Sequence, residues 1–164
     1  MLTRTTLVVA FLAAGITSTA PAVAQTPPPI VAPTGPTLDE ARKALAAAEA
    51  AAAKAGVAVT CVVVDARGDL IALHRMDRAR FITTDIARGK ALTAAIFGQP
   101  SGSLDRIANS PWFQNLNTAA QGRLYPVQGG LPIIRNNQTY GAIACSGATG
   151  QQDEDSARAG VSTF

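Results

Sequence analysis

A helical repeat of apolar residues marks the segment that begins near residue 37. Thr37 is followed three positions later by Glu40, the pattern of a capping box at a helix start. Apolar residues then repeat every three or four positions, at Leu38, Ala41, Leu45, Ala48, Ala52 and Ala55. Gly56 is a natural C-terminal stop. We therefore expect a helix over 37–55 whose small alanine face lies close against a sheet.

The next two apolar runs predict a β-hairpin. Val57–Val64 is almost continuously apolar and rich in β-branched residues, as in a buried central strand. The polar turn 65–69 separates it from Leu70–Met76, which we expect to return as the neighbouring strand.

A second group of strands is expected near the C-terminus. Leu124–Val127 predicts a short strand, and the glycine-rich stretch Gly129–Pro132 predicts a special turn. Ile133–Arg135 and Thr139–Ser146 predict a hairpin, because the two asparagines at 136–137 tolerate a positive φ.

Three more segments predict helices. One starts at Thr83 or Thr84, either of which could cap it, and runs to Phe97; shorter ones cover Ser103–Asn109 and Asp153–Gly160. The resulting order, α-β-β-α-β-β-β-α, is typical of an α+β fold in which helices pack on a mostly antiparallel sheet.

The first 36 residues differ in character from the rest. Met1–Ala24 reads as a signal peptide, with Arg4 near its start, a short apolar stretch, and an A-x-A cleavage sequence at 22–24. The segment 25–36 holds five of the ten prolines and predicts an extended tether. We expect a periplasmic or secreted protein with no membrane span in its mature form and one folded domain, 37–164.

Composition narrows the function without naming it. The chain of 164 residues is 48% hydrophobic and 15% charged, which excludes wholesale disorder. Its net charge of +3 is too small to argue for a nucleic-acid partner, and a single histidine excludes a histidine-cluster metal site within one subunit. Cys61 and Cys145 would pair if their strands are neighbours, but we favour buried free thiols, because buried cysteine often acts as a small hydrophobe.

Two polar groups flank the first hairpin and the helix after it. His74 ends the second strand with Arg75, Met76 and Asp77; it could ligate a metal or a haem iron or move protons, or be an ordinary surface histidine. Thr84, Arg88 and Lys90 could hold a carboxylate at the start of the next helix, or simply belong to a capped helix with a solvated face.

Two more polar groups lie near the C-terminus. Adjacent Gly129 and Gly130 could expose backbone amides to a ligand, or form only a tight turn. The polar loop 147–153, which leads into Asp153, could be a lid or a plain connector.

The order and spacing of these motifs resemble one protein family across essentially all of 37–164. The matching stretches are 38–41 (LDEA), 63–70 (VVDARGDL), 74–77 (HRMD), 85–94 (DIARGKALTA), 129–132 (GGLP), 141–147 (GAIACSG) and 152–154 (QDE). In these the chain resembles the GlcG/HbpS-like family, formerly a domain of unknown function, also described as a haem-binding or haem-degrading domain.

The resemblance implies an α-β-α, profilin-like fold with a five-stranded antiparallel sheet, and assembly into homo-oligomers from dimers to octamers. Some exported relatives bind haem or iron and interact with sensor kinases, whereas others accompany glycolate or propanediol metabolism and a few are enzymes. The family therefore does not fix one chemistry. The Glu-x-x-Glu segment of iron-binding relatives is absent from this chain, which argues against iron binding.

The first functional hypothesis is an exported, oligomeric haem-binding protein. The residues expected around the haem are His74 at the iron, Arg75, Arg78 and Arg88 at the propionates, Thr93 as a second candidate, and Met76, Phe81 and Phe97 against the porphyrin.

Two further hypotheses remain open. A small-carboxylate-binding protein or enzyme would use Thr84, Arg88, Lys90, Gly129 and Gly130 to hold the anion, with Asp77 or Asp153 as general base. A sensory or scaffold subunit without a small ligand could use Trp112 and Phe113 as an interface anchor, although core packing would equally explain them.

Overall fold

The computed structural model describes residues 35–164. The expected signal peptide and the tether up to residue 34 lie outside the described residues. The elements are α1 (Leu38–Lys54), β1 (Thr60–Asp65), β2 (Leu70–Arg75), α2 (Thr83–Phe97), the 3-10 helix η1 (Ser101–Ile107), α3 (Pro111–Ala119), β3 (Gly130–Arg135), β4 (Gln138–Ser146) and α4 (Gly150–Val161). Within 35–164 no helix combines the length and the apolar character that crossing a membrane requires.

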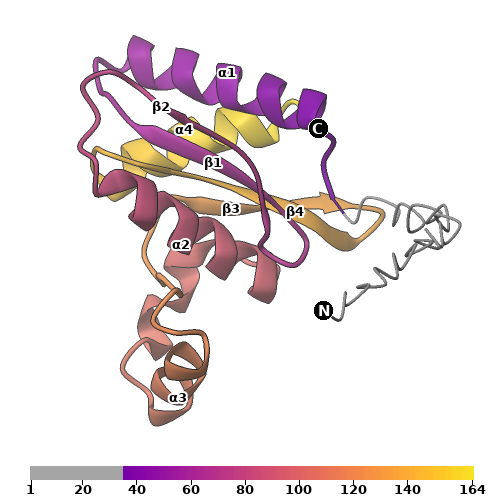
Figure 1. The fold of residues 1–164 in the computed structure, drawn as a ribbon, viewed down its shortest axis with the longest axis vertical. Coiled ribbons are helices and arrows are strands. Elements are labelled where there is room, and N and C mark those ends of the chain that lie inside the picture. Colours follow the sequence, from indigo (N-terminus) through magenta and orange to yellow (C-terminus); the bar gives the residue numbers. More distant parts are fainter. Residues whose placement is uncertain (1–34) are drawn as a thin grey trace, which may run out of the picture. The chain divides into compact units, whose positions relative to one another are not determined.

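The four strands form one antiparallel sheet in the order β2-β1-β4-β3. In Figure 1, α1 and α4 lie on one face of this sheet and α2 on the other. Every residue of the central strand β1 is buried, whereas the edge strand β2 is only partly covered. The expectation of an α+β fold with helices packed on an antiparallel sheet is therefore confirmed.

The two faces of the sheet carry separate cores. Under α1 and α4 the strands contribute Cys61, Val63, Ile133, Ile143 and Cys145, packed against alanines and Leu45 of α1. Under α2 the core is made almost wholly of valine and alanine. The small side chains on the helices let both layers lie close to the sheet, and for α1 the alanine repeat predicts this.

The start of α1 follows the sequence pattern closely. The Thr37 hydroxyl accepts from the Glu40 amide, and the Glu40 carboxylate accepts from the Thr37 amide at 2.8 Å, which completes the capping box.

The expected fifth strand is wrong. Leu124–Val127 runs through a loop, because its amides bond to side chains and not to a neighbouring strand: Leu124 N donates to Asn117 Oδ1 and Tyr125 N to Thr93 Oγ1. Gly129–Pro132 is also not a turn throughout. Gly129 has φ +122°, but Gly130 already starts β3.

The helices differ from expectation mainly at their ends. No side chain caps α2; Thr83 lies inside the helix and bonds to Thr60. The segment expected to be a helix over 103–109 is the 3-10 helix η1, and α3 was missed altogether, although Ser110 followed by Pro111 is a good helix start. In α4 the cap is Thr149, so the helix starts at Gly150.

The preference for free thiols is also wrong, because Cys61 and Cys145 form a disulfide. The two residues are directly opposite each other on β1 and β4, with Cα atoms 4.1 Å apart. Apolar runs reveal which residues are buried but not the register between strands, and the register decides whether two thiols meet.

Candidate functional site

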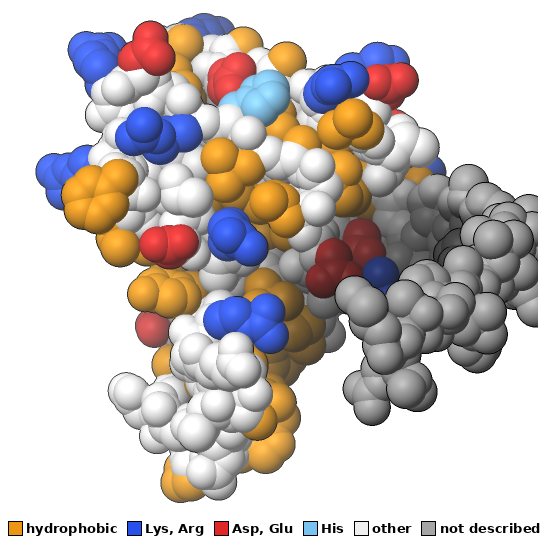
Figure 2. All heavy atoms as spheres, in the orientation of Figure 1, with side chains coloured by type: hydrophobic (Ala, Val, Ile, Leu, Met, Phe, Trp, Pro, Cys, Tyr) orange, Lys and Arg blue, Asp and Glu red, His pale blue; other side chains and the backbone are white. Residues whose placement is uncertain are grey.

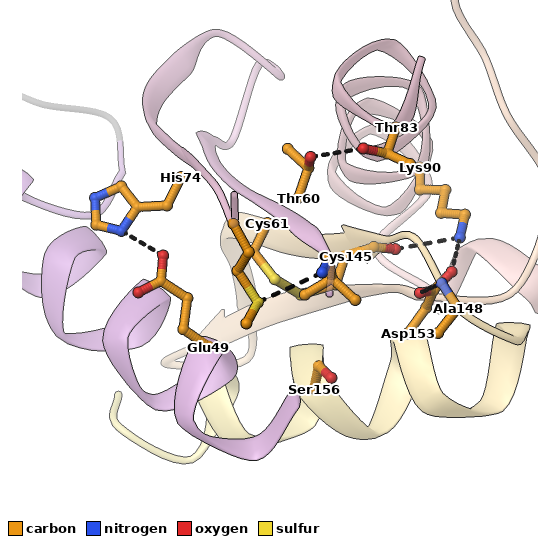
Figure 3. The surroundings of a disulfide bond; sticks show 12 residues. Glu49, Thr60, Cys61, His74, Thr83, Lys90, Cys145, Ala148, Asp153 and Ser156 are labelled. Carbon is orange, nitrogen blue, oxygen red and sulfur yellow. Dashed lines mark hydrogen bonds and ion pairs between the residues drawn. A yellow bond between two sulfur atoms is a disulfide. The ribbon is translucent and has the colours of Figure 1, made fainter. Parts of the chain in front are cut away.

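His74 lies near the end of the edge strand β2, on the face of the sheet that α1 covers, opposite Cys61 of β1. Its Nδ1 lies 2.8 Å from Oε1 of Glu49 on α1 (Figure 3). The side chain of His74 is 40% exposed and that of Glu49 is 32% exposed. Because a carboxylate oxygen accepts hydrogen bonds, Nδ1 is the donor in this contact, and in the tautomer that the contact favours Nε2 carries the free lone pair.

The oriented imidazole offers one nitrogen ligand to a metal. Between residues 35 and 164 no three His, Cys, Asp or Glu side chains are grouped so that they could hold a metal ion by themselves. His74 is therefore suited to a metal that brings other ligands with it.

The basic residues after β2 lie in a separate hollow. Arg78 and Arg80 line an open depression of about 530 Å³ with Gly147 and Thr149, at the start of α4. Arg75 does not line this depression, and its guanidinium donates to the Ala79 carbonyl at 3.0 Å. Figure 2 shows Lys and Arg side chains scattered over this face of the molecule, with the histidine beside an acidic group. The expected basic residues thus do not surround His74 as one group.

A second hollow, of about 390 Å³, lies beside α2 and contains Arg88. Arg123 and Tyr125 of the loop after α3 line its other side. Among the described residues, nothing forms a hydrogen bond or ion pair with the Arg88 guanidinium or the Tyr125 hydroxyl. His74 is not part of this hollow, so the structure does not bring His74 and Arg88 into one cavity.

Thr93 lies beneath that hollow and bonds to the backbone of Tyr125, one of the lining residues. It is fully buried, its hydroxyl donates to the Gly89 carbonyl, and it accepts from the Tyr125 amide, both at 2.8 Å. Its polar atoms are therefore engaged inside the protein and position the loop of Tyr125, where a ligand role was expected.

Lys90 and Asp153 bond to each other in the interior. Lys90 Nζ lies 2.8 Å from Asp153 Oδ2 and 3.2 Å from the Cys145 carbonyl, and both side chains are at most 4% exposed (Figure 3). Burial raises the pKa of the Asp153 carboxyl above its ordinary value, and the hydrogen bond and charge of Lys90 oppose that rise. Both charged groups are buried and bonded inside the protein, so the pair joins α2 to α4.

The adjacent glycines pack against the same lysine. A Cβ at Gly129 would lie 2.7 Å from Lys90 Nζ, and the Gly130 amide donates to Ser101 Oγ at 3.0 Å. These residues allow close packing of β3 on α2, and the Gly130 amide is not open to an anion.

The start of α2 is similarly closed. The amides of Thr83 and Thr84 donate to the carbonyls of Arg80 and Phe81. Asp77 is exposed in the preceding loop, where none of the described residues bonds to its carboxylate. The expected anion site at Thr84 therefore has fewer free donors than the sequence pattern indicates.

Phe81 and Phe97, which were expected to contact the porphyrin together, do not lie on one surface. Phe81 precedes α2 and is 81% exposed, whereas Phe97 ends this helix, which is roughly 20 Å long, and stacks on Phe113. Phe113 is buried in the small core beneath α3, while Trp112 is 59% exposed. The alternative of core packing is thus correct for Phe113. A porphyrin cannot contact Phe81 and Phe97 at the same time.

Two charged residues that the structure brings forward, Glu49 and Arg123, were missing from the sequence-based candidates. Glu49 is the only charged residue between Lys43 and Lys54, a signal that could have drawn attention to it. Arg123 and Tyr125 flank the buried Leu124 in an irregular loop, for which the sequence carries no periodic signal.

The sequence of this chain is similar to those of known proteins. The family described as "Haem degrading protein HbpS-like" matches residues 37–162. An uncharacterised 15.0 kDa protein from the dhaT-dhaS intergenic region of Citrobacter freundii is 34% identical over 129 residues, 78% of this chain and 91% of that protein. GlcG of Escherichia coli K12 is 33% identical over 104 residues, 62% of this chain and 74% of GlcG.

Solved structures agree with the sequence relatives. Klebsiella pneumoniae ORFY superposes with a TM-score of 0.74 at 33% identity, over 79% of this chain and 90% of ORFY. A double mutant of Streptomyces reticuli HbpS gives 0.72 at 30% identity, over 90% of this chain and 98% of HbpS. A PduOC:heme complex gives 0.72 at 24% identity, which shows a shared fold. The chain belongs to the HbpS-like family.

Proposed function

We propose that this protein binds haem and that Nε2 of His74 is the iron ligand. The observation that carries the proposal is the 2.8 Å contact between His74 Nδ1 and Glu49 Oε1. A carboxylate behind a ligating histidine fixes the tautomer and the ring orientation and increases the basicity of the nitrogen that faces the metal. The family description, which names haem, supports the same ligand.

The donor set fits the chemistry of haem in two respects. His74 presents Nε2 on a partly exposed surface, where an iron already held by a porphyrin can use it as a ligand. Arg78 and Arg80 do not surround His74, but they follow it by four and six positions in the sequence. They line the hollow after β2, and their guanidiniums are suited to bidentate bonds with the propionate carboxylates at the edge of a porphyrin. Bound haem would supply ligand or redox chemistry at its iron, while the chain supplies the axial ligand, its orientation and the cationic anchor.

We also propose that the protein works outside the cytoplasm, as a homo-oligomer. The Cys61–Cys145 disulfide supports export, because disulfides persist in oxidising compartments. His74 lies on an open face and in none of the cavities described above, so a second copy could cover the exposed side of a bound porphyrin. The mass of the protein in solution, with and without hemin, tests the assembly.

Hemin titration followed by absorbance tests the iron ligand directly. His74 is the only histidine of the chain, so a histidine-ligated spectrum can come from no other residue. We expect His74→Ala to lose that spectrum and to weaken hemin binding about tenfold or more, a cost of roughly 1.4 kcal/mol or above. Glu49→Gln should keep binding but shift the spectrum, because a neutral amide replaces the oriented carboxylate.

The controls separate ligation from general charge. Arg78→Gln with Arg80→Gln should weaken hemin binding without changing the axial-ligand spectrum. Arg106→Gln makes the same charge change per site at an exposed residue of η1, and it should leave both the affinity and the spectrum unchanged. An unchanged Soret band and affinity in His74→Ala would remove His74 from the site.

A further inference from the structure

The hollow beside α2 is walled by one stripe of the helix. Asp85, Arg88, Gly89 and Leu92 follow one another at spacings of three, one and three residues, so they share a helix face. Arg123 and Tyr125 close the hollow from the loop after α3. The site is thus assembled from segments that are far apart in sequence.

Two glycines allow the side chains of Tyr125 and Leu92 to pack closely against the backbone that lines the hollow. A Cβ at Gly89 would lie 2.6 Å from Cδ2 of Tyr125, so the absence of a side chain lets the phenol ring lie on α2. At Gly68, φ is +86° and a Cβ would collide with Cδ1 of Leu92. Ordinary side chains at these positions would displace Tyr125 or Leu92.

The loop that carries the second cation is fixed by the interior. Leu124 is 2% exposed, and its amide donates to Asn117 Oδ1 at 2.9 Å. The Tyr125 amide is held by Thr93, and Arg123 Nε donates to the Ala120 carbonyl at 3.0 Å. The backbone of this loop is therefore positioned before any ligand arrives, which lowers the entropy cost of binding.

The charges at the hollow favour a monoanion. Arg88 and Arg123 contribute two positive charges and Asp85 one negative charge, so the lining carries a net +1. Val64, Leu70 and Leu92 give it an apolar part, and its volume of about 390 Å³ falls within the roughly 300–1,000 Å³ of small-molecule sites. We infer that this hollow is a second binding site, separate from His74, for an organic carboxylate with an apolar body, held by Arg88 and Arg123.

Calorimetric titration of the full-length chain with benzoate and hexanoate tests the inference. Both probes join a carboxylate to an apolar body, and benzamide and hexanamide are their neutral counterparts. We expect at least one carboxylate to bind about tenfold or more tightly than its amide, because a charge-assisted bond to a guanidinium has no equivalent in the amide. Binding of neither acid, or equal binding of acid and amide, would overturn the inference.

Charge variants locate the binding. Arg88→Gln and Arg123→Gln should each weaken carboxylate binding about tenfold, Asp85→Asn should strengthen it by removing a like charge, and Arg106→Gln should leave it unchanged. These positions are exposed, so the variants should fold, which a thermal melt verifies. Binding that ignores both Arg88→Gln and Arg123→Gln would contradict this site.

The same variants show whether the haem proposal or the carboxylate proposal is wrong, independently of each other. His74→Ala should leave carboxylate binding unchanged, and Arg88→Gln should leave hemin binding unchanged, because the two residues lie in different places. If benzoate displaced hemin and Arg88→Gln weakened both ligands, the hollow would be part of the haem site and its separate role would be rejected.

Discussion

Two cations of α2 lie two positions apart in sequence and in opposite environments. Lys90 is 3% exposed and bonds to Asp153 and to the Cys145 carbonyl, whereas Arg88 is exposed at the hollow and bonds to no other described residue. Two helix positions correspond to a rotation of about 200°, so one residue faces the sheet and the other faces away.

The difference teaches what each charge can do. A buried ion pair has given up its hydration, so removing one partner leaves the other charge without compensation. An exposed guanidinium with no internal partner keeps its hydration and its five donors for a ligand. We therefore expect changes at Lys90 and its surroundings to affect the free energy of unfolding, and changes at Arg88 to affect only binding.

Lys90→Met should have the largest effect on stability. It leaves the Asp153 carboxylate buried without its partner, which typically costs about 3–5 kcal/mol. Urea unfolding measures the loss. Because burial then raises the pKa of Asp153 further, the folded state takes up the proton more readily than the unfolded state, and the loss should shrink as pH falls.

The double variant Lys90→Met with Asp153→Leu is the control for that prediction. Removing both charges removes the uncompensated one, so much of the lost stability should return. If Lys90→Met cost less than about 1 kcal/mol at neutral pH, the interpretation of Lys90 and Asp153 as a closed structural pair would be wrong.

Loss of the disulfide should come next in size. The Cys61→Ala, Cys145→Ala variant removes a cross-link between residues separated by 84 positions, and we expect a loss of about 2–4 kcal/mol in urea unfolding. Benzoate affinity should not change, because the disulfide is on the opposite side of the sheet from α2. Reductant should destabilise the natural chain but not the variant, and equal sensitivity of the two would contradict the assignment.

The sequence predicted the fold well where one local signal was enough. The α1 capping box, the buried run of β1 and the turn before β2 each depend on neighbouring residues and were correct. The errors concern residues whose partners are distant: Leu124–Val127 bonds to α2 and α3, and Cys61 meets Cys145 through the register of β1 and β4. Only tertiary structure determines those pairings.

The candidate site shows the same division. His74 was named from sequence, but its partner Glu49 lies 25 positions earlier on another element. Arg88 was named for a carboxylate site, whereas its companions Arg123 and Tyr125 come from an irregular loop. The sequence places Lys90 and Arg88 on different sides of α2, but it does not show that Asp153 of α4, 63 positions later, pairs with Lys90.

Glu40 tests an environment between these two extremes. Its carboxylate accepts from Arg135 at 2.8 Å and from the Thr37 amide, and these contacts lower its pKa from 4.5 to about 2. Because the folded-state pKa is depressed, the ionised carboxylate stabilises the fold above about pH 4.5, and that contribution is lost as pH falls towards 2. Glu40→Gln should cost about 1 kcal/mol at pH 7, measured by urea unfolding, and the difference should narrow through this range. A difference independent of pH would show that Glu40 acts only through its shape.

Arg88→Gln should have the smallest effect on stability, within about 0.5 kcal/mol, because no described residue depends on this guanidinium. Arg106→Gln is the control for this change in the free energy of unfolding, because it makes the same charge change at another exposed position. Equal unfolding curves for the two variants, together with a loss of benzoate affinity in Arg88→Gln alone, would separate binding from folding within one helix. A loss of stability as large as that of Lys90→Met would instead mean that Arg88 has an internal partner, and the contrast between the two cations would disappear.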